Sequence, residues 1–426
     1  MKKKSLANIF KGDKVIWMIF FILCLVSIIE VYSASSSLTL KEGYFWSPII
    51  DHVKKILLGL VALIFVLNVE CKYFKMLTPI ALAASFLMVI WVLVGGQTIN
   101  GANRWITILG IQFQPSELAK GALVLATAQI LSAMQTDKGA DRKAFRYILL
   151  LSGWMIIPIA IENGSTAFLL YITIFLMMFI GRVPRDQLGK LFGVTVLLAT
   201  LFLSVVLVCG KTDQEMASSP RQTLTEQTAK AGAGKPKGLA ARFEDRLDTW
   251  KSRIEKFVAP DSIPPNKIDL RGKDSQRYYS CIAIASSSVM GKGAGKSTAR
   301  DRLAQAFSDF IYAIIIEELG VCGMAGVASL YIFLLFRVMI IANRCVNNFP
   351  AFLAMGLAIM LVSQALFNMM VAVGLAPVTG QPLPLISRGG TSTVINCIYI
   401  GMILSVSRSA KKKPEKDAQP ANNREK

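Results

Sequence analysis

The sequence has very little histidine and no paired cysteines. Its 426 residues include a single histidine, His52, which excludes a histidine-rich metal site and a histidine-based catalytic relay. The 7 cysteines are odd in number, scattered, and mostly inside apolar stretches, with no C-x-x-C pair. We therefore expect them to be small core residues rather than metal ligands or disulfide partners.

A strict phosphate-binding loop is also missing. The stretch "MGKGAGKST" (residues 290–298) resembles one, but the pattern G-x-x-x-x-G-K-[ST] ending at Ser297 requires a glycine where the chain has Met290. The preceding "SCIAIASSSV" is short and half polar, so it lacks the character of a buried strand leading into such a loop. We expect a structural loop and no bound nucleotide.

Apolar residues are abundant and make up 53% of the chain. Apolar runs of about 18 or more residues recur, and each is long enough to cross the hydrocarbon core of a bilayer. We therefore predict an all-α polytopic membrane protein with about ten transmembrane helices. The expected spans are Val15–Ser33, Ile50–Val69, Leu77–Gly95, Glu117–Met134, Phe145–Ile161, Thr166–Val183, Leu191–Gly210, Phe310–Ile341, Ala351–Leu375 and Thr391–Val406.

The charges predict how the chain is oriented in the membrane. Both ends are basic, as are the short loops "TDKGADRKAFR" and "GRVPRDQLGK", so the positive-inside rule places both termini in the cytoplasm. The first apolar run lacks a small-residue cleavage site, which favours a retained helix of the cytoplasmic (inner) membrane over a removed signal peptide. The net charge of +20 lies mostly in these flanks and one long loop, which favours membrane lipids over nucleic acid as the partner.

The predicted organisation follows from the spans. A cytoplasmic basic N-terminus (1–14) precedes transmembrane helices 1–7 (15–210), a large extracytoplasmic loop (211–309), helices 8–10 (310–407) and a cytoplasmic basic tail (408–426). Within the loop, apolar residues of "ARFEDRLDTWKSRIEKFVAP" recur at helical spacing between charges, which predicts an amphipathic helix on the membrane surface. These residues are Phe243, Leu247, Trp250, Ile254 and Phe257. The glycine-rich stretch 290–298 lies in the same outward loop, where no ATP is present.

Three other polar clusters interrupt the apolar pattern. They are "GANRWITILGIQFQPSELAKGA", "SDFIYAIIIEELG" and the Pro/Gly-rich "APVTGQPLPLISRGGTS". In the first, Glu117 and Lys120 lie one helical turn apart, either as a structural ion pair or as part of a site. In the second, Glu317 and Glu318 form either a helix-packing ion pair or a cation contact. Irregular backbone at membrane depth is tolerated only when buried in protein or lining a cavity, so we expect these segments to converge on one extracytoplasmic site.

Four segments carry a specific resemblance. "GANRWI", "QPSELAK", "DFIYAIIIEELG" and "VTGQPLPLISRGGTS" are similar, in order and spacing, to the signatures of the SEDS family of cell-wall proteins, which includes FtsW and RodA. The resemblance runs from about residue 101 to 408. It implies a ten-helix membrane enzyme, a peptidoglycan glycosyltransferase that polymerises lipid II into glycan strands at the outer face of the cytoplasmic membrane, with release of undecaprenyl pyrophosphate.

The resemblance also implies partners, a cofactor and a cellular role. A class B penicillin-binding transpeptidase and other division proteins are the implied partners, and a divalent cation, Mg²⁺ or Mn²⁺, is the implied cofactor. An FtsW-like role in division is favoured by the long basic tails and by "ISRGGTS", with a RodA-like role in elongation as the alternative. A lipid II flippase and a non-catalytic scaffold of the division machinery are the alternatives outside this class of enzyme.

The family's essential acid is an aspartate of the large loop, usually followed by proline, and this loop has no Asp-Pro. Counting back from "MGKGAGKS", which resembles the family's "WGxGxGxS" segment, assigns the catalytic role to Asp269. Asp261 is the competitor, since it follows a Phe-x-x-Pro element. Two further departures are Asn163 in "ENGSTA", where many members carry aspartate, and Arg388, where many carry tyrosine.

The implied reaction needs a carboxylate to take a hydroxyl proton, cations to meet the departing pyrophosphate, and an apolar groove for the lipid tails. Arg104, Lys120 and Arg388 are candidate cations for the pyrophosphate, with a divalent ion as the alternative. Trp105 is either part of the site or an anchor at the membrane interface. The residues predicted to bind lipid II and the growing glycan chain are Arg104, Trp105, Glu117, Lys120, Gln276, Asp309, Glu318, Ser387 and Arg388.

Overall fold

The structure of the protein is a computed structural model, and ten long helices dominate its described part. It describes residues 10–35, 46–95, 97–99, 102–108, 111–209, 247–248, 250–255, 257, 275–303 and 306–410. The long helices are α1 (Lys14–Ala34), α3 (Ser47–Asn68), α4 (Cys71–Gly95), α5 (Pro115–Ala133), α6 (Arg142–Glu162), α7 (Gly164–Ile180), α8 (Arg185–Cys209), α13 (Ile311–Ala342), α14 (Asn348–Ala372) and α15 (Thr391–Ser409).

These helices coincide one for one with the predicted spans. A long apolar run in a membrane forms a helix because only a helix pairs all of its backbone N–H and C=O groups within the segment. Of the described helices, 6 combine the length and the apolar composition needed to cross a membrane, and α7 is a shorter apolar helix. The prediction of an all-α polytopic membrane protein is confirmed.

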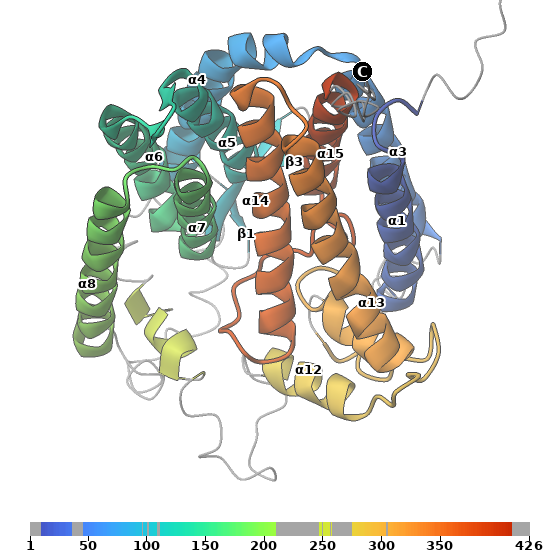
Figure 1. Ribbon diagram of the computed structural model, residues 1–426. Helices are drawn as coiled ribbons and strands as arrows, with labels where there is room; N and C mark the ends of the chain where they lie inside the picture. Colours follow the sequence, from blue (N-terminus) through green and yellow to red (C-terminus); the bar gives the residue numbers. More distant parts are fainter. Residues whose placement is uncertain are drawn as a thin grey trace, which may run out of the picture.

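The helices form one bundle in which α14 occupies the centre (Figure 1). It packs against α5, α7, α13 and α15, and α3 packs along α15. The chain enters α1 and leaves α15 at the same end of the bundle, where the Asp13 backbone N–H donates to Ser407 Oγ at 2.9 Å. At the edge, α8 exposes most of its apolar side chains, as a helix facing lipid would.

The opposite end carries the small elements. A short antiparallel sheet joins α4 to α5, with β1 (Gln97–Ile99) and β3 (Ile111–Phe113) on either side of β2 (Ala102–Ile108). Arg104 and Trp105 therefore lie on a strand rather than in the irregular loop expected from the sequence. β1 and β3 have only three residues each, and glycines at 95, 96, 101 and 110 surround the strands, so a period-2 pattern does not stand out in the sequence. A second, two-stranded sheet, β4 (Gln135–Thr136) and β5 (Gly139–Ala140), lies at the other end of α5 and joins it to α6.

Two helical pieces come from the predicted outer loop. α12 (Ser275–Ala285) is anchored to the bundle by Ser280 Oγ, which donates to the Ala372 carbonyl at 2.6 Å. The described positions between 247 and 257 are helical, as the spacing of Leu247 and Trp250 predicted. The Trp250 ring packs edge-on against Phe202 of α8 with centroids 4.9 Å apart. The placement of this helical segment on a membrane surface stays a prediction.

Candidate functional site

The Pro/Gly-rich stretch between α14 and α15 passes through the bundle without regular structure. We call residues 379–388 the threaded segment. Its backbone carbonyls accept hydrogen bonds from three helices: Ile386 from Ser27 Oγ of α1 (2.7 Å), Gln381 from Asn368 Nδ2 of α14 (2.7 Å), and Pro384 from the Tyr331 hydroxyl of α13. Of the two environments that tolerate irregular backbone at membrane depth, this segment occupies the first: it is largely buried in protein, and side chains rather than a ladder satisfy these backbone carbonyls.

The end of this segment joins the start of α13. Ser387 is buried, accepts from the Leu383 N–H at 2.7 Å, and donates from Oγ to the Ser308 carbonyl at 2.5 Å. Arg388 lies over the Phe307 ring, and its Nη2 lies 3.4 Å from Asp51 Oδ2 on α3. The Asp309 carbonyl accepts from Asn368 Nδ2 at 2.8 Å. Ser387, Arg388 and Asp309 therefore lie together, as predicted.

A buried ion pair lies beside the threaded segment. Lys120 Nζ is 2.9 Å from Glu117 Oε1, and both side chains are only 1% exposed. The same ammonium donates to Gln364 Oε1 of α14 at 2.6 Å, and Gln364 Nε2 donates to the Pro382 carbonyl at 3.0 Å. The ion pair is one of the two alternatives that the spacing of three residues left open, and the partner on α14 adds a link to the threaded segment.

The glycine-rich stretch 291–299, which we call the carboxylate loop, wraps around the two glutamates of α13. Glu317 accepts from Lys292 Nζ at 2.6 Å, from Ser297 Oγ at 2.5 Å and from the Thr298 N–H at 3.0 Å. Glu318 accepts from the Gly295 and Ser297 N–H groups, at 2.8 and 3.2 Å, and from Ser33 Oγ of α1. Both glutamates are fully buried. The likeness to a phosphate-binding loop thus has a physical basis, since the loop presents N–H groups to an anion, but the anion is the chain's own carboxylate.

Two glycines allow the carboxylate loop to approach α13 this closely. Gly320 interrupts the helix with φ 67° and ψ −160°, and Gly291 has φ 75°. A Cβ on Gly320 would lie 2.3 Å from the Val289 carbonyl oxygen, and one on Gly291 would lie 2.2 Å from the Glu318 carbonyl oxygen. Only glycine accommodates both the backbone angles and the contact.

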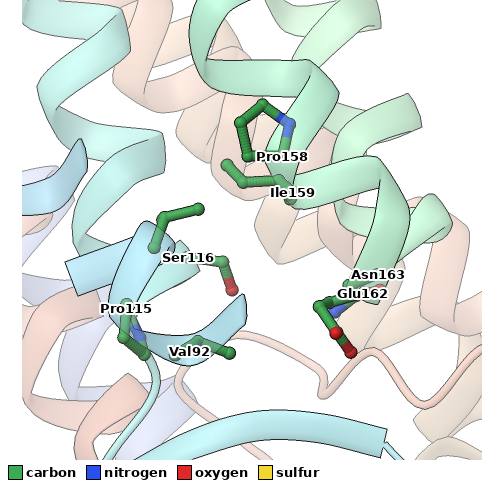
Figure 2. Close-up of a pocket in the computed structure, with 8 residues that line it drawn as sticks. Val92, Pro115, Ser116, Pro158, Ile159, Glu162 and Asn163 are labelled. Carbon is green, nitrogen blue, oxygen red and sulfur yellow. The ribbon is translucent and has the colours of Figure 1, made fainter. Parts of the chain in front are cut away.

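A pocket lies at the same end of the bundle, where α4, α5, α6 and the start of α7 meet (Figure 2). The space between its walls, including the part open to solvent, is about 310 Å³. Most of its wall is apolar, and Ser116, Glu162 and Asn163 supply the polar part. The apolar lining consists of Val89, Val92, Pro115, Pro158 and Ile159. In the sequence, Pro115 and Ser116 mark a helix start, and Asn163 is a departure from the family pattern. The position of Asn163 between two apolar runs, with serine and threonine two and three residues later, is the signal of a helix cap.

The remaining predicted site residues are placed in part. Asp269 and Asp261 lie outside the described residues, so the choice of catalytic acid stays a prediction. Arg104 lies on β2, with its side chain outside the described part, and Trp105 pairs across the sheet with Gln97. Gln276 lies in the first turn of α12 and is partly buried. No group of three or more His, Cys, Asp or Glu side chains that could hold a metal ion occurs among the described residues. A divalent cation stays a prediction.

Fold and site together define a multi-pass, all-helical membrane protein with buried charge at one end of its bundle. The model of the FtsW, RodA and SpoVE family, described as "Cell cycle protein", matches residues 13–219 and 243–412. The chain belongs to this family, as the four sequence segments predicted.

Curated relatives are similar over nearly their whole length. A probable peptidoglycan glycosyltransferase FtsW of Coxiella burnetii is 28% identical over 401 residues, which cover 92% of this chain and 95% of the relative. One of Hydrogenovibrio crunogenus, with the same name, is 29% identical over 403 residues, covering 92% and 90%.

Solved structures share the fold. The Thermus thermophilus rod shape determining protein RodA matches with a TM-score of 0.62 and 22% identity, covering 95% of this chain and 100% of that one. A chain from a structure described as "Structural coordination of polymerization and crosslinking by a peptidoglycan synthase complex" matches with a TM-score of 0.66 and 23% identity, over the same shares.

Proposed function

We propose that this protein is a peptidoglycan glycosyltransferase that polymerises lipid II at the outer face of the cytoplasmic membrane. The observation that carries the proposal is the family match, which covers the helical bundle and also residues 243–412, the part that includes both candidate acids. The shared name of the curated relatives, which predicts the same activity, supports it.

The reaction joins a sugar hydroxyl of one substrate to the anomeric carbon of another, and polyprenyl pyrophosphate leaves. A loop carboxylate, Asp269 or Asp261, takes the hydroxyl proton, which contributes roughly 10²–10⁴-fold to the rate. The buried Glu117–Lys120 pair adds no net charge by itself, since its two charges compensate each other at 2.9 Å. Arg388 shares the single carboxylate of Asp51 with Lys55, so that cluster keeps a net positive charge. The candidate cations for the leaving group are therefore Arg388, Arg104 or a divalent ion of the Mg²⁺ or Mn²⁺ class, which would offset the developing charge on the pyrophosphate.

The test is polymerisation by purified protein with its cognate transpeptidase and a divalent ion. Glycan strands are measured for wild type, Asp269→Ala and Asp261→Ala. Loss in Asp269→Ala alone, with the protein folded and partner-bound, would identify the base. Absence of polymer from wild type under every partner and metal tried would end the proposal in favour of a lipid II flippase or a non-catalytic scaffold.

We also propose that the end of the bundle holding α12 and the carboxylate loop faces outward, and that both termini are cytoplasmic. The proximity of Asp13 to Ser407 supports placing both ends on one side, and the basic flanks favour the cytoplasm. Cysteines introduced at Lys296 and at Lys411 in a variant without native cysteines would test this with a membrane-impermeant thiol reagent on intact cells. Labelling at 296 alone is expected; labelling at 411 would contradict it.

We propose a role in cell division because the curated relatives share the name FtsW. We propose a class B penicillin-binding transpeptidase as the partner. The similarity to a chain of a peptidoglycan synthase complex that coordinates polymerisation and crosslinking supports a partner of that class. Depletion of the protein in its own cells separates the two roles. Filaments without septa are expected for a division enzyme, whereas rounded cells would indicate elongation.

A further inference from the structure

Cations gather at the end of the bundle where the chain enters α1 and leaves α15. α3 ends there and α4 begins there. We call four of these cations the basic rim: Lys11 in the segment before α1, Lys72 and Lys75 in the first two turns of α4, and Arg408 in the last turn of α15. The three lysines are exposed and Arg408 is half-buried, so the basic rim lies at the surface.

Two cations of the basic rim converge on one neutral residue. Asn68, at the end of α3, accepts from Lys11 Nζ through its Oδ1 at 3.4 Å and from Arg408 Nη2 through its backbone carbonyl at 3.5 Å. The orientation of its amide is fixed, because Nδ2 donates to the Ile64 carbonyl at 2.8 Å. A neutral amide positions the two cations without neutralising them, so both charges stay available to an anion.

The segment that carries Lys11 is held in place by the first helix. Trp17 Nε1 of α1 donates to the Lys11 carbonyl at 2.9 Å. The Phe10 ring packs edge-on against the Trp17 ring, with centroids 5.0 Å apart. The position of the Lys11 ammonium is therefore set by contacts with the bundle.

The basic rim has little compensating negative charge. Glu70 pairs with Lys72 at 2.7 Å, but both side chains are at least 60% exposed, so this pair is weak. Asp13 is paired with Arg337 at 2.7 Å and adds no net charge. No other member of the basic rim has an ion pair among the described residues. Four cations thus share one weakly paired carboxylate, which favours an anion with more than one negative charge.

Large apolar side chains point outward directly below these cations. Phe65 on α3 is 72% exposed, and Met76 on α4 is 70% exposed. Both helices pack against α15. Cations above an apolar surface match a phospholipid, whose phosphate lies at the membrane surface and whose acyl chains lie below it. A free anion or an acidic protein segment would use the cations alone.

The cations form two pairs. Lys11 and Arg408 meet at Asn68, and Lys72 and Lys75 lie about one turn apart on α4. The two pairs are neighbours, since the first residue of α4 contacts the end of α15. A phospholipid in which glycerol links two phosphates would offer one phosphate to each pair, and its four acyl chains would cover the exposed faces of α3 and α4.

We propose that the basic rim binds a phospholipid with two phosphates, diphosphatidylglycerol, at the cytoplasmic surface of the membrane. The side of the membrane follows from the orientation proposed above. The binding itself is independent of the proposed glycosyltransferase activity, because the basic rim lies at the opposite end of the bundle from the candidate site. The bound lipid links the ends of α3, α4 and α15 and stabilises the folded protein by mass action.

The experiment measures lipid binding to the purified full-length protein in detergent by native mass spectrometry. The probes are diphosphatidylglycerol, phosphatidylglycerol with its single phosphate, neutral phosphatidylcholine, and inorganic pyrophosphate without acyl chains. Two double variants remove one pair of cations each: Lys11→Gln with Arg408→Gln, and Lys72→Gln with Lys75→Gln. Only the first double variant touches Asn68, so the second tests the site without disturbing that contact.

The matched control is the double variant Lys138→Gln with Lys190→Gln. Both lysines are exposed at the same end of the bundle, in the turn between α5 and α6 and near the start of α8. The control removes the same charge from the same side of the protein but leaves the basic rim intact. Melting temperatures without added lipid, expected to be unchanged, establish that each variant is folded.

Wild type is expected to bind diphosphatidylglycerol about 10-fold more tightly than phosphatidylglycerol, and to bind phosphatidylcholine and pyrophosphate weakly. Each double variant of the basic rim should weaken the binding of diphosphatidylglycerol about 10- to 30-fold, because each removes two cations that face phosphate. The control should change it less than about threefold. Diphosphatidylglycerol should also raise the melting temperature of wild type more than that of either double variant.

Wild-type affinity in either double variant would overturn the proposal. An equal loss in the control would also overturn it, by showing that binding follows total charge rather than this site. Equal affinity for the two anionic lipids would contradict the two-phosphate assignment. Pyrophosphate that bound as tightly as the lipid would identify a site for a free anion and refute the lipid.

Discussion

The carboxylate loop and the pocket are two polar regions at one end of the same bundle, and they differ in how completely their hydrogen bonds are made. Around Glu317 and Glu318 the carboxylate oxygens accept from backbone N–H groups, hydroxyls and the Lys292 ammonium. On the pocket wall, Asn163 Nδ2 has no partner among the described residues. In the first region the carboxylates are fully paired, whereas the second contains a buried donor that the fold leaves unpaired.

We therefore expect the fully paired groups to matter for the stability of the fold, and the unpaired donor to matter little for it. Buried polar groups that are fully paired stabilise one conformation, and removing one partner leaves the others unsatisfied. Removing a donor that the fold leaves unpaired leaves no other group of the protein unsatisfied. Variants in the two regions should therefore affect different measurements.

The largest effect is expected at the buried ion pair. Lys120→Met leaves the Glu117 charge buried without its cation, which costs about 3–5 kcal/mol in the free energy of unfolding. Unfolding in detergent by circular dichroism measures the loss. Lys55→Met is the matched control, since Lys55 pairs with Asp51 near the surface and is 33% exposed. A loss of less than about 1 kcal/mol for Lys120→Met would show that the pair is not buried as described.

The next effect is expected where the carboxylate loop crosses α13. Gly320→Ala places a Cβ against the Val289 carbonyl and forces unfavourable backbone angles, which together cost about 2–4 kcal/mol. The control is Gly326→Ala on the same helix, where the added Cβ meets no atom within 4 Å. Thermal unfolding of the two variants compares them directly. Equal melting temperatures would mean that the close approach is absent.

Glu317→Gln is expected to destabilise the protein by about 2–3 kcal/mol. The amide retains one acceptor, but its NH₂ group faces donors and the Lys292 ammonium loses its counter-charge. Limited proteolysis within 286–303 measures the loosening of the loop as well as the loss of stability. Glu70→Gln, at an ion pair with Lys72 that is about 60% exposed, is the control and should change neither.

A smaller, pH-dependent effect is expected at the other end of the bundle. Burial raises the pKa of the Asp13 carboxyl, but its hydrogen bonds with Arg337 and with the N–H groups of Val15 and Ile16 lower it more, so the pKa lies below its ordinary value of 3.8. A lowered pKa stabilises the folded protein above pH 3.8, and this contribution is lost as the pH falls through the folded value.

Wild type should therefore be more stable than Asp13→Asn by on the order of 1 kcal/mol in the free energy of unfolding. Its melting temperature should exceed that of the variant by a constant amount between pH 5 and pH 7. The difference should shrink below about pH 4. A difference that grew on acidification would contradict the assigned direction. Arg337→Met should abolish the same difference, because it removes the main group that lowers the pKa.

The smallest effect on stability is expected in the pocket. Asn163→Ser keeps a cap oxygen for α7 and removes a donor that has no partner among the described residues, so its free energy of unfolding should change by less than about 0.5 kcal/mol. A loss of about 2 kcal/mol or more would place Asn163 with the carboxylate loop, as a residue that holds the structure.

The sequence predicts the helices well and the polar contacts unevenly. Each long helix coincides with an apolar run, and the Glu117–Lys120 pair follows from spacing along one helix. Hydrogen bonds between segments that are distant in the sequence leave no comparable pattern of residue spacing. Nothing in the spacing of "GKGAGKST" indicates that its N–H groups would point at Glu317 and Glu318, about 20 residues later.

The pocket was missed for a related reason. Val89, Val92 and Ile159 read as ordinary residues of apolar helices, and only the fold brings them around Asn163. The sequence does mark Asn163 as a departure from the family pattern, and the structure gives that departure a place. The strands were missed because all of them except β2 are only two or three residues long, which is too little periodicity to be distinguished from a loop.

The threaded segment constrains the order in which this protein can be assembled. Its carbonyls are bonded by Ser27 of the first helix, Tyr331 of α13 and Asn368 of α14, so its place exists only after these helices have entered the membrane. It also precedes the last helix in the chain. Helices can insert one by one during synthesis, but the centre of the bundle closes last, and a chain halted before residue 379 would expose unpaired side chains there to quality-control proteases.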